Sequence, residues 1–107
     1  MIRFGNKRNF EDFKPQIPNQ VLPLFDSIRK FCLELGDNVI EDVRMHRIVY
    51  CKSMTFRWFL DVEPEEEGLI LKIQKDRKDM KKIIHVKKDE EITEYTKIIK
   101  EAFDLIH

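Results

Sequence analysis

Basic side chains gather in one run of the sequence, and this run is the first candidate for a binding surface. Residues 72–88, KIQKDRKDMKKIIHVKK, hold eight basic side chains against two acidic ones. Such a run attracts anionic partners, including nucleic acid. Two interpretations stay open, because the run could instead be a solvated segment that pairs with the acidic C-terminal region. Its candidate binding residues are Lys72, Lys75, Arg77, Lys78, Lys81 and Lys82.

The stretch TFRWFLDVE, residues 55–63, supplies two further binding candidates, Arg57 and Phe59. It alternates as a half-buried strand does, so Trp58 is expected on the apolar face and the two candidates on the other. An arginine beside an aromatic ring on an open sheet face can hold phosphate and stack on a base. The predicted open face carries four such residues: His46, Tyr50, Arg57 and Phe59.

Metal-dependent catalysis is a second class of function that the sequence suggests. Asp61 followed by Asp76 and Lys78 resembles metal-dependent nucleases, in which carboxylates hold a hard cation and lysine stabilises charge at the phosphate. Asp76 follows the predicted strand instead of lying in it, so this pattern is the weaker alternative. The sequence has no serine elbow, glycine-rich phosphate loop or histidine pair at metal-ligand spacing. We therefore expect a non-catalytic binding module with no cofactor and no metal.

Composition limits the partners and the cellular setting. The 107 residues suit one domain, and 20 basic residues balance 20 acidic ones, so only a local patch could attract nucleic acid. No apolar stretch is long enough to span a bilayer and no signal peptide is present, which predicts a cytoplasmic protein without a membrane partner. Cys32 and Cys51 are expected to be buried free thiols. One alanine with abundant Lys, Glu and Ile is typical of heat-adapted proteins.

Hydrophobic periodicity predicts the elements that position these residues. A helix is predicted over 21–35, and a second helix after Asp89, its expected N-cap. Between them lie three or four strands, the first over 44–51, and their short connections require antiparallel neighbours. The prediction is a two-layer α+β domain over 21–107, with both helices on one sheet face.

Two segments outside these elements have alternative interpretations. Residues 1–20 are expected to form an irregular arm, whose phenylalanines and cations could stack on bases or could pin the arm to the domain. The acidic segment 65–67 is expected at a hairpin tip, either solvated or in contact with a cation or a basic partner. Gly68 is expected to supply a positive φ to that hairpin.

Three stretches resemble a small domain family of unknown function, described as a predicted transport protein and often fused to restriction-endonuclease-like domains. They are LELGDNVIEDV, then IVYCKSMTFRWFLDVEPEEEGLILKI, then ITEYTKIIKEAFDLI, within residues 22–106. The family motifs match Gly36–Asp37, Phe59 to Pro64 and Gly68–Leu69. RKDMKKIIHV replaces a Gly/Trp/His-rich segment of the family. The resemblance implies a helix–sheet–helix fold, no catalytic residues, and an association with nucleic-acid biology.

Protein–protein interaction or self-assembly is the other alternative function. A partner protein or a second copy of the chain, forming a homodimer, would then bind an apolar patch. Such binding would be nearly independent of salt, whereas contacts with phosphate weaken steeply as salt rises.

Overall fold

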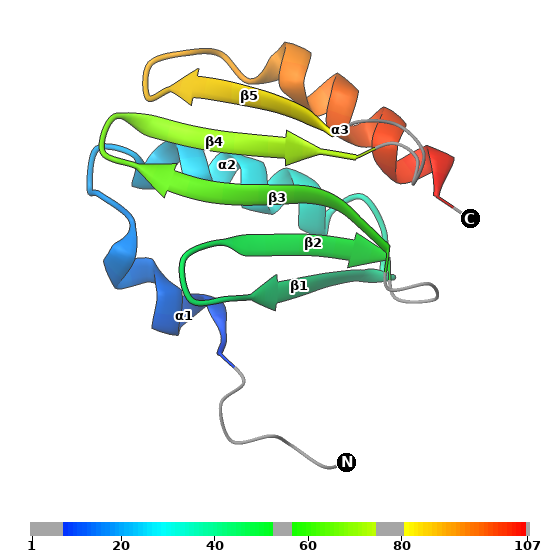
Figure 1. The fold of residues 1–107 in the computed structure, drawn as a ribbon, viewed down its shortest axis with the longest axis horizontal. Helices are drawn as coiled ribbons and strands as arrows, with labels where there is room; N and C mark the ends of the chain where they lie inside the picture. Colours follow the sequence, from blue (N-terminus) through cyan, green and yellow to red (C-terminus); the bar gives the residue numbers. More distant parts are fainter. Residues whose placement is uncertain (1–7, 53–56, 75–80, 107) are drawn as a thin grey trace.

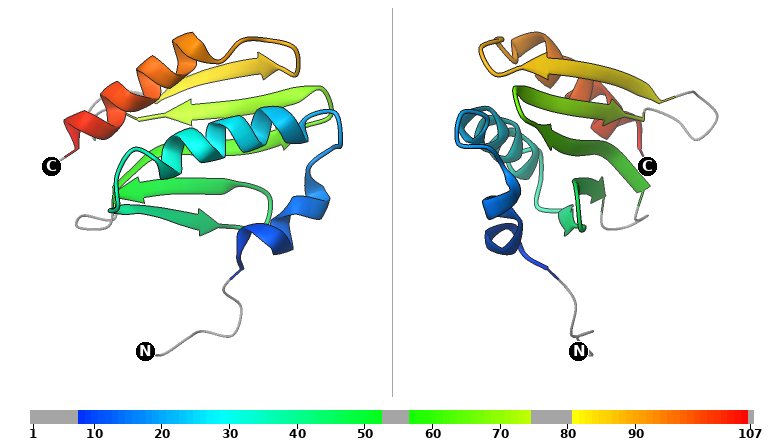
Figure 2. Two further views of the ribbon diagram at one scale, coloured as in Figure 1. Left: turned by 180° about the vertical axis from the view of Figure 1, so that it is seen from behind. Right: turned by 60° about the vertical axis from the view of Figure 1, so that its left-hand side comes forward.

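An antiparallel sheet forms one layer of the protein and helices form the other (Figure 1). The computed structural model describes residues 8–52, 57–74 and 81–106. Within them the strands pair in chain order: β1 (Val39–Val43), β2 (Ile48–Lys52), β3 (Arg57–Glu65), β4 (Gly68–Ile73) and β5 (Lys82–Lys87). The helices are α1 (Phe10–Phe13), the 3₁₀ helix η1 (Lys14–Gln16), α2 (Leu22–Leu33) and α3 (Thr93–Leu105). Figure 2 shows α2 and α3 lying on the same face of the sheet, which leaves the opposite face open.

The predicted α+β fold class, with helices on one sheet face, is confirmed, but the sheet has one strand more than expected. The additional strand is β1, which lies in a segment that reads as a connection because Glu41 and Asp42 interrupt its apolar residues. Glu41 nevertheless lies on the helix-covered face, where Arg29 of α2 binds its carboxylate. Because this core-side residue is charged, the alternation of apolar and polar residues that marks a strand is not recognisable in the sequence.

The first predicted strand, over 44–51, begins later than expected, because its first residues form the connection between β1 and β2. The backbone N–H of Arg44 donates to the carbonyl of Arg47 at 2.8 Å, so the chain turns where a strand was expected. β2 begins only at Ile48, and Tyr50 lies on the helix-covered face with no exposed surface. The prediction that Tyr50 lies on the open face is therefore wrong, and His46 lies in the exposed turn.

A β-bulge in β3 reverses the predicted faces of its first residues. Tyr50 pairs with Leu60 and Cys51 pairs with Trp58, so Phe59 has no partner across the strand pair. Phe59 and Leu60 consequently both point into the core, as bulges allow. The Phe59 ring meets Phe103 of α3 edge to face, with 5.2 Å between ring centroids. Trp58 is thereby placed on the open face and Phe59 in the core, the reverse of the prediction.

The N-terminal segment is helical over 10–16, where an irregular arm was expected. Asn9 caps α1 through a capping box with Asp12, whose side chain bonds back to the Asn9 N–H. Phe10 and Phe13 are buried, and both rings contact Phe25 of α2 with centroids 6.0 Å apart. These two rings therefore pin the segment to the domain and are not available to stack on bases.

A buried polar network joins β1 and β2 to α2. Arg29 donates two hydrogen bonds to the Glu41 carboxylate, at 2.7 and 3.1 Å, and the Tyr50 hydroxyl donates a third at 2.8 Å. The Arg29 guanidinium also lies 4.0 Å from the centre of the Phe10 ring. Because the Glu41 side chain is only 15% exposed, these donors replace most of its water.

The same part of the core makes stability sensitive to alkali. Burial raises the pKa of the Cys32 thiol and of the Tyr50 hydroxyl, and the Glu41 carboxylate raises both further. In the unfolded chain these groups ionise at about pH 8.5 and about pH 10. The folded protein keeps their protons to higher pH, so their contribution to stability is complete below about pH 8.5 and is lost as pH rises.

We therefore expect the free energy of unfolding to fall by about 1.4 kcal/mol per pH unit for each group once the pH exceeds the pKa of that group in the unfolded chain, so Cys32 dominates between about pH 9 and 10. Urea unfolding at about pH 8, 9 and 10 measures the slope. A Cys32→Val variant should show a shallower slope between about pH 9 and 10. An unchanged slope in that variant would contradict the role assigned to Cys32.

The acidic hairpin tip is engaged within the molecule. Glu65 lies 3.2 Å from His85 Nδ1 and Glu67 lies 3.2 Å from Lys88 Nζ, while the carbonyl of Glu66 accepts from Gln20 at 2.7 Å. The side chains of Glu65 and Glu67 contact different neighbouring residues, so the tip does not form a converging carboxylate site.

The start of α3 differs from the prediction. Asp89 does not cap α3, which begins after Ile92 without a side-chain cap. Glu90 orders the preceding loop instead, accepting from the Lys87 N–H at 3.1 Å and from the Tyr95 hydroxyl at 2.7 Å.

Candidate anion-binding site on the open sheet face

A cavity of about 170 Å³ lies on the open face of the sheet. The register places Val49 of β2, Asp61 of β3 and Lys72 of β4 side by side at its floor. Three more residues reach it from the β1–β2 turn and the start of β5. The described residues that line it are Arg44, Arg47, Val49, Trp58, Asp61, Lys72 and Lys81.

Among the described residues, positive charge dominates the lining, with four basic side chains and one acidic one. Arg44 is paired with Asp42 at 3.1 Å, and Arg47 is paired with Asp61 at 3.3 Å. Within the described residues, Lys72 and Lys81 make no ion pair. Two ammonium groups beside one cavity form a site that can hold an oxyanion.

Trp58 gives the cavity its aromatic wall. The bulge at Phe59 turns Trp58 to the open face, opposite Cys51 of β2, where it is half-buried. An aromatic ring beside cationic groups is the combination that binds the bases and phosphates of single-stranded nucleic acid. The tryptophan that the sequence analysis placed in the core is therefore available to a ligand.

Asp61 is the residue of the site whose burial costs the most folding free energy. It is only 8% exposed, its Oδ2 faces Arg47, and its buried Oδ1 has no hydrogen-bond partner within the described residues. Burial raises the pKa of its carboxyl above the usual range, although Arg47 and Lys72 oppose that rise. A buried carboxylate with an unsatisfied oxygen lowers stability, and such groups cluster at functional sites.

Asp61→Asn is expected to keep or increase the free energy of unfolding at pH 7, by up to about 1 kcal/mol. The raised carboxyl pKa means that Asp61 stabilises the fold fully only below about pH 4, and this contribution is lost as pH rises through the folded pKa. Urea unfolding at about pH 7 and pH 4 should show the advantage of the variant disappearing in acid. A loss above about 1 kcal/mol at pH 7 would mean that the ion pair with Arg47 outweighs the cost of burial.

Asp42→Asn is the matched control for this prediction. Asp42 lies on β1, two strands away from Asp61, its side chain is 42% exposed, and it is paired with Arg44. We expect its replacement to change stability by less than about 0.5 kcal/mol at either pH, because an exposed ion pair contributes little.

The residues predicted to bind a partner are distributed over several places. Lys72 and Lys81 line the cavity, and Lys82 is exposed at the start of β5. Phe59 has no exposed surface, so its predicted place on an open binding face is wrong. The remaining predicted residues of the basic run, Lys75, Arg77 and Lys78, lie outside the described residues.

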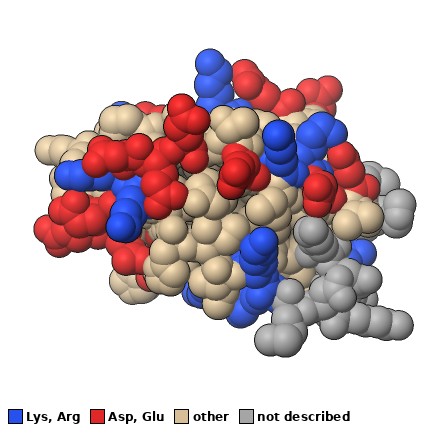
Figure 3. Space-filling model, turned by 90° about the horizontal axis from the view of Figure 1, so that it is seen from above, with Lys and Arg blue, Asp and Glu red and all other residues tan. Residues whose placement is uncertain are grey.

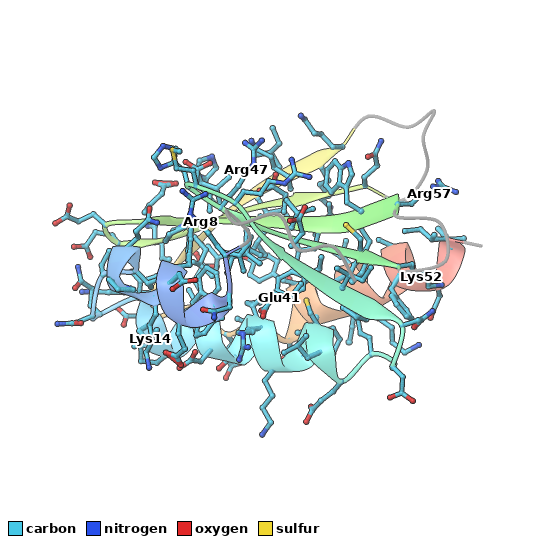
Figure 4. The ribbon with its side chains drawn as sticks, turned by 90° about the horizontal axis from the view of Figure 1, so that it is seen from below. Arg8, Lys14, Glu41, Arg47, Lys52 and Arg57 are labelled. Atoms are coloured by element: carbon cyan, nitrogen blue, oxygen red, sulfur yellow. The ribbon has the colours of Figure 1, made fainter. Side chains whose placement is uncertain are left out.

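Arg57 is separate from the cavity. In the register of β2 and β3, Arg57 lies opposite Lys52. The Lys52 ammonium lies 4.1 Å from the centre of the Phe103 ring, on the helix-covered side of the sheet. Figure 4 shows Arg57 at the end of the sheet, away from Arg47. The bulge moves Arg57 off the open face for the same reason that it buries Phe59.

Five lining residues were not among the predicted binding residues: Arg44, Arg47, Val49, Trp58 and Asp61, the last of which was named only for the nuclease alternative. One signal in the sequence could have pointed to the arginines. Arg44 and Arg47 flank Met45 and His46, so three of these four residues are polar, as is common between strands, although none is a Gly, Pro, Asn or Asp that marks a hairpin turn. The position of Trp58 could not be found in this way, because it depends on the bulge.

Other surfaces of the protein carry balanced charge. A wider hollow of about 620 Å³ between α1, α2 and β1 contains Arg8, Lys14 and Arg29, but also Glu11, Asp26 and Glu41. Along the edge formed by β5 and α3, acidic and basic side chains are interspersed (Figure 3). The open-face cavity is therefore the better candidate for an anionic ligand.

The nuclease alternative lacks support in the described residues. They contain no group of three or more His, Cys, Asp or Glu side chains that could hold a metal ion. Asp76 and Lys78 lie outside the described residues, so their position relative to Asp61 stays a prediction.

Among the described helices, none has the length and apolar character that crossing a membrane requires.

Comparison with known proteins identifies no relative of this protein. No family model, no curated protein and no solved structure matches the chain. The resemblance to the domain family described as a predicted transport protein therefore stays a prediction, and the function must be argued from the geometry of the cavity.

Proposed function

We propose that this protein is a non-catalytic binding module that holds single-stranded nucleic acid on the open face of its sheet. The observation that carries this proposal is the position of Trp58, in a cavity that it shares with four basic side chains. Stacking of a base on the indole and contacts from Lys72 and Lys81 to phosphate would supply the binding energy. Duplex should bind more weakly, because its bases are stacked and cannot reach Trp58.

Fluorescence of Trp58 offers a direct test, because it is the only tryptophan in the chain. Single-stranded DNA and RNA oligonucleotides should quench its emission saturably at about 50 mM salt, and the affinity should fall by about 7- to 20-fold at about 200 mM. This range corresponds to two or three phosphate contacts on a single strand. Duplex of the same sequence serves as the comparison.

Charge reversal locates the contact on the open face. Lys72→Glu and Lys81→Glu should each weaken binding by tenfold or more, measured by the anisotropy of a labelled oligonucleotide. Lys97→Glu is the matched control, because Lys97 is exposed on α3, in the layer that covers the other face. The proposal fails if all three variants bind equally well.

A protein partner is the second candidate, favoured by one observation. Ile83 of β5 is 51% exposed and pairs with Lys72, so an apolar side chain lies next to the cavity on the open face. No quenching by any oligonucleotide at either salt concentration would favour this alternative. An Ile83→Asp variant that loses a salt-insensitive protein contact would support it.

A further inference from the structure

We propose that the cavity binds a phosphate of the nucleic acid together with one proton, which Asp61 takes up as the phosphate enters. This inference rests on the proposed function and assigns a role to the one acidic residue of the lining. Asp61 would act as a built-in competitor for the anion when it is ionised and as a hydrogen-bond donor to it when it is neutral.

The charged groups around Asp61 come from every neighbouring element. Arg44 and Arg47 reach the cavity from the β1–β2 turn, Lys72 faces Asp61 from β4, and Lys81 approaches from the start of β5. Three other carboxylates of the described residues belong to this face: Glu63 and Glu65 on β3 and Asp42 on β1, and Glu65 contacts His85 of β5. Protonation of Asp61 removes the negative charge that lies in the cavity itself, which strengthens the attraction for phosphate.

Protonation would also free a guanidinium group. Arg47 Nε now lies 3.3 Å from Asp61 Oδ2, and this ion pair competes with any contact between Arg47 and a ligand. A neutral carboxyl group holds Arg47 less strongly, so the guanidinium can turn to the phosphate. The carboxyl O–H can then donate to a phosphate oxygen. The proton comes from solvent and returns to it when the phosphate leaves.

The surroundings of Asp61 already favour its neutral form. Its unpartnered Oδ1 is buried, so the ionised carboxylate lacks the hydrogen bonds that would stabilise its charge. A phosphate in the same cavity adds a negative charge close to this group and raises its pKa further. Phosphate and proton therefore strengthen each other's binding, as thermodynamic linkage requires.

The test compares wild type with Asp61→Asn over a pH series from about 5 to about 7.5, above the ordinary carboxyl pKa of about 4, where only a carboxyl of raised pKa still takes up a proton. Oligonucleotides with hydroxyl ends are used, because terminal phosphates themselves titrate near pH 6. Wild-type affinity should rise as pH falls, by at most about tenfold per pH unit for one proton. Asp61→Asn should bind more tightly than wild type at pH 7.5, with little dependence on pH.

Histidines titrate in the same range, so His46→Gln and His85→Gln are the controls for the exposed histidines of the β1–β2 turn and of β5, where His85 shares the open face with Ile83. Each variant should keep the pH dependence of wild type. The inference is overturned if Asp61→Asn retains that dependence. It is also overturned if this variant binds more weakly than wild type at every pH, because Asp61 would then accept a hydrogen bond from the base. Failure of the wild type to bind at any pH would instead overturn the proposed function itself.

Discussion

Replacing Gly68 with alanine is expected to lower the free energy of unfolding by about 3 kcal/mol. A Cβ atom at this position would lie 2.0 Å from the carbonyl oxygen of Val86 and 3.0 Å from its carbonyl carbon. Both atoms belong to the backbone of β5, which cannot move aside as a flexible side chain can. The strands β4 and β5 would have to separate where Gly68 pairs with Lys87. Urea unfolding with an unchanged m-value measures the loss.

Gly36→Ala is the matched control for this prediction. At Gly36 the nearest atom to an added Cβ is Asn38 Oδ1, at 2.8 Å, followed by Phe103 Cζ at 3.4 Å. Both are side-chain atoms, and the amide of Asn38 can rotate away. We expect a loss below about 1 kcal/mol, because the alanine also reduces the entropy of the unfolded chain. Equal losses in the two variants would contradict the argument from close backbone approach.

Glu41→Ala is expected to cost about 3 kcal/mol of unfolding free energy, the second large effect. The substitution removes the acceptor of three hydrogen bonds and leaves Arg29 without its partner in a partly buried place. It also leaves the Tyr50 hydroxyl unsatisfied in the core, since Tyr50 has no exposed surface. Chemical denaturation at pH 7 measures this loss.

A double-mutant cycle separates the tyrosine contribution from the rest of the network. Tyr50→Phe alone should cost about 1 kcal/mol, because it removes one hydroxyl and one hydrogen bond. In the background of Glu41→Ala, the same change should cost less or stabilise, because the hydroxyl no longer has a partner. Additive losses would show that the Tyr50 hydroxyl does not depend on Glu41.

The sequence by itself determined the class of fold and the identity of most elements. Apolar residues at helical spacing predicted α2, and Phe25, Ile28 and Cys32 of that stripe are buried. The hairpin of β3 and β4 was expected from the apolar runs on both sides of the acidic segment, with Gly68 at its end. These predictions succeed because residues a few positions apart set a helix or strand period, and one face of each element must be buried.

Local pattern failed where distant side chains decide which way a residue points. Glu41 is a core-side residue of β1 only because Arg29 and Tyr50 satisfy its carboxylate. Gly68 reads as a turn glycine, yet what it requires is space beside the backbone of Val86. In both cases the contacting residue lies on another element, so the neighbouring residues in the sequence do not reveal it.

The candidate site was predicted only in part, for the same reason. Lys72 and Lys81 were found from the density of basic residues, which is a property of the sequence. Trp58 and Phe59 were assigned to the wrong faces, because strict alternation cannot foresee a bulge. The tertiary structure decided these two positions. Burying Phe59 against Phe103 of α3 is compatible with burying Leu60 only if one residue of β3 loses its partner, and this leaves the tryptophan on the open face.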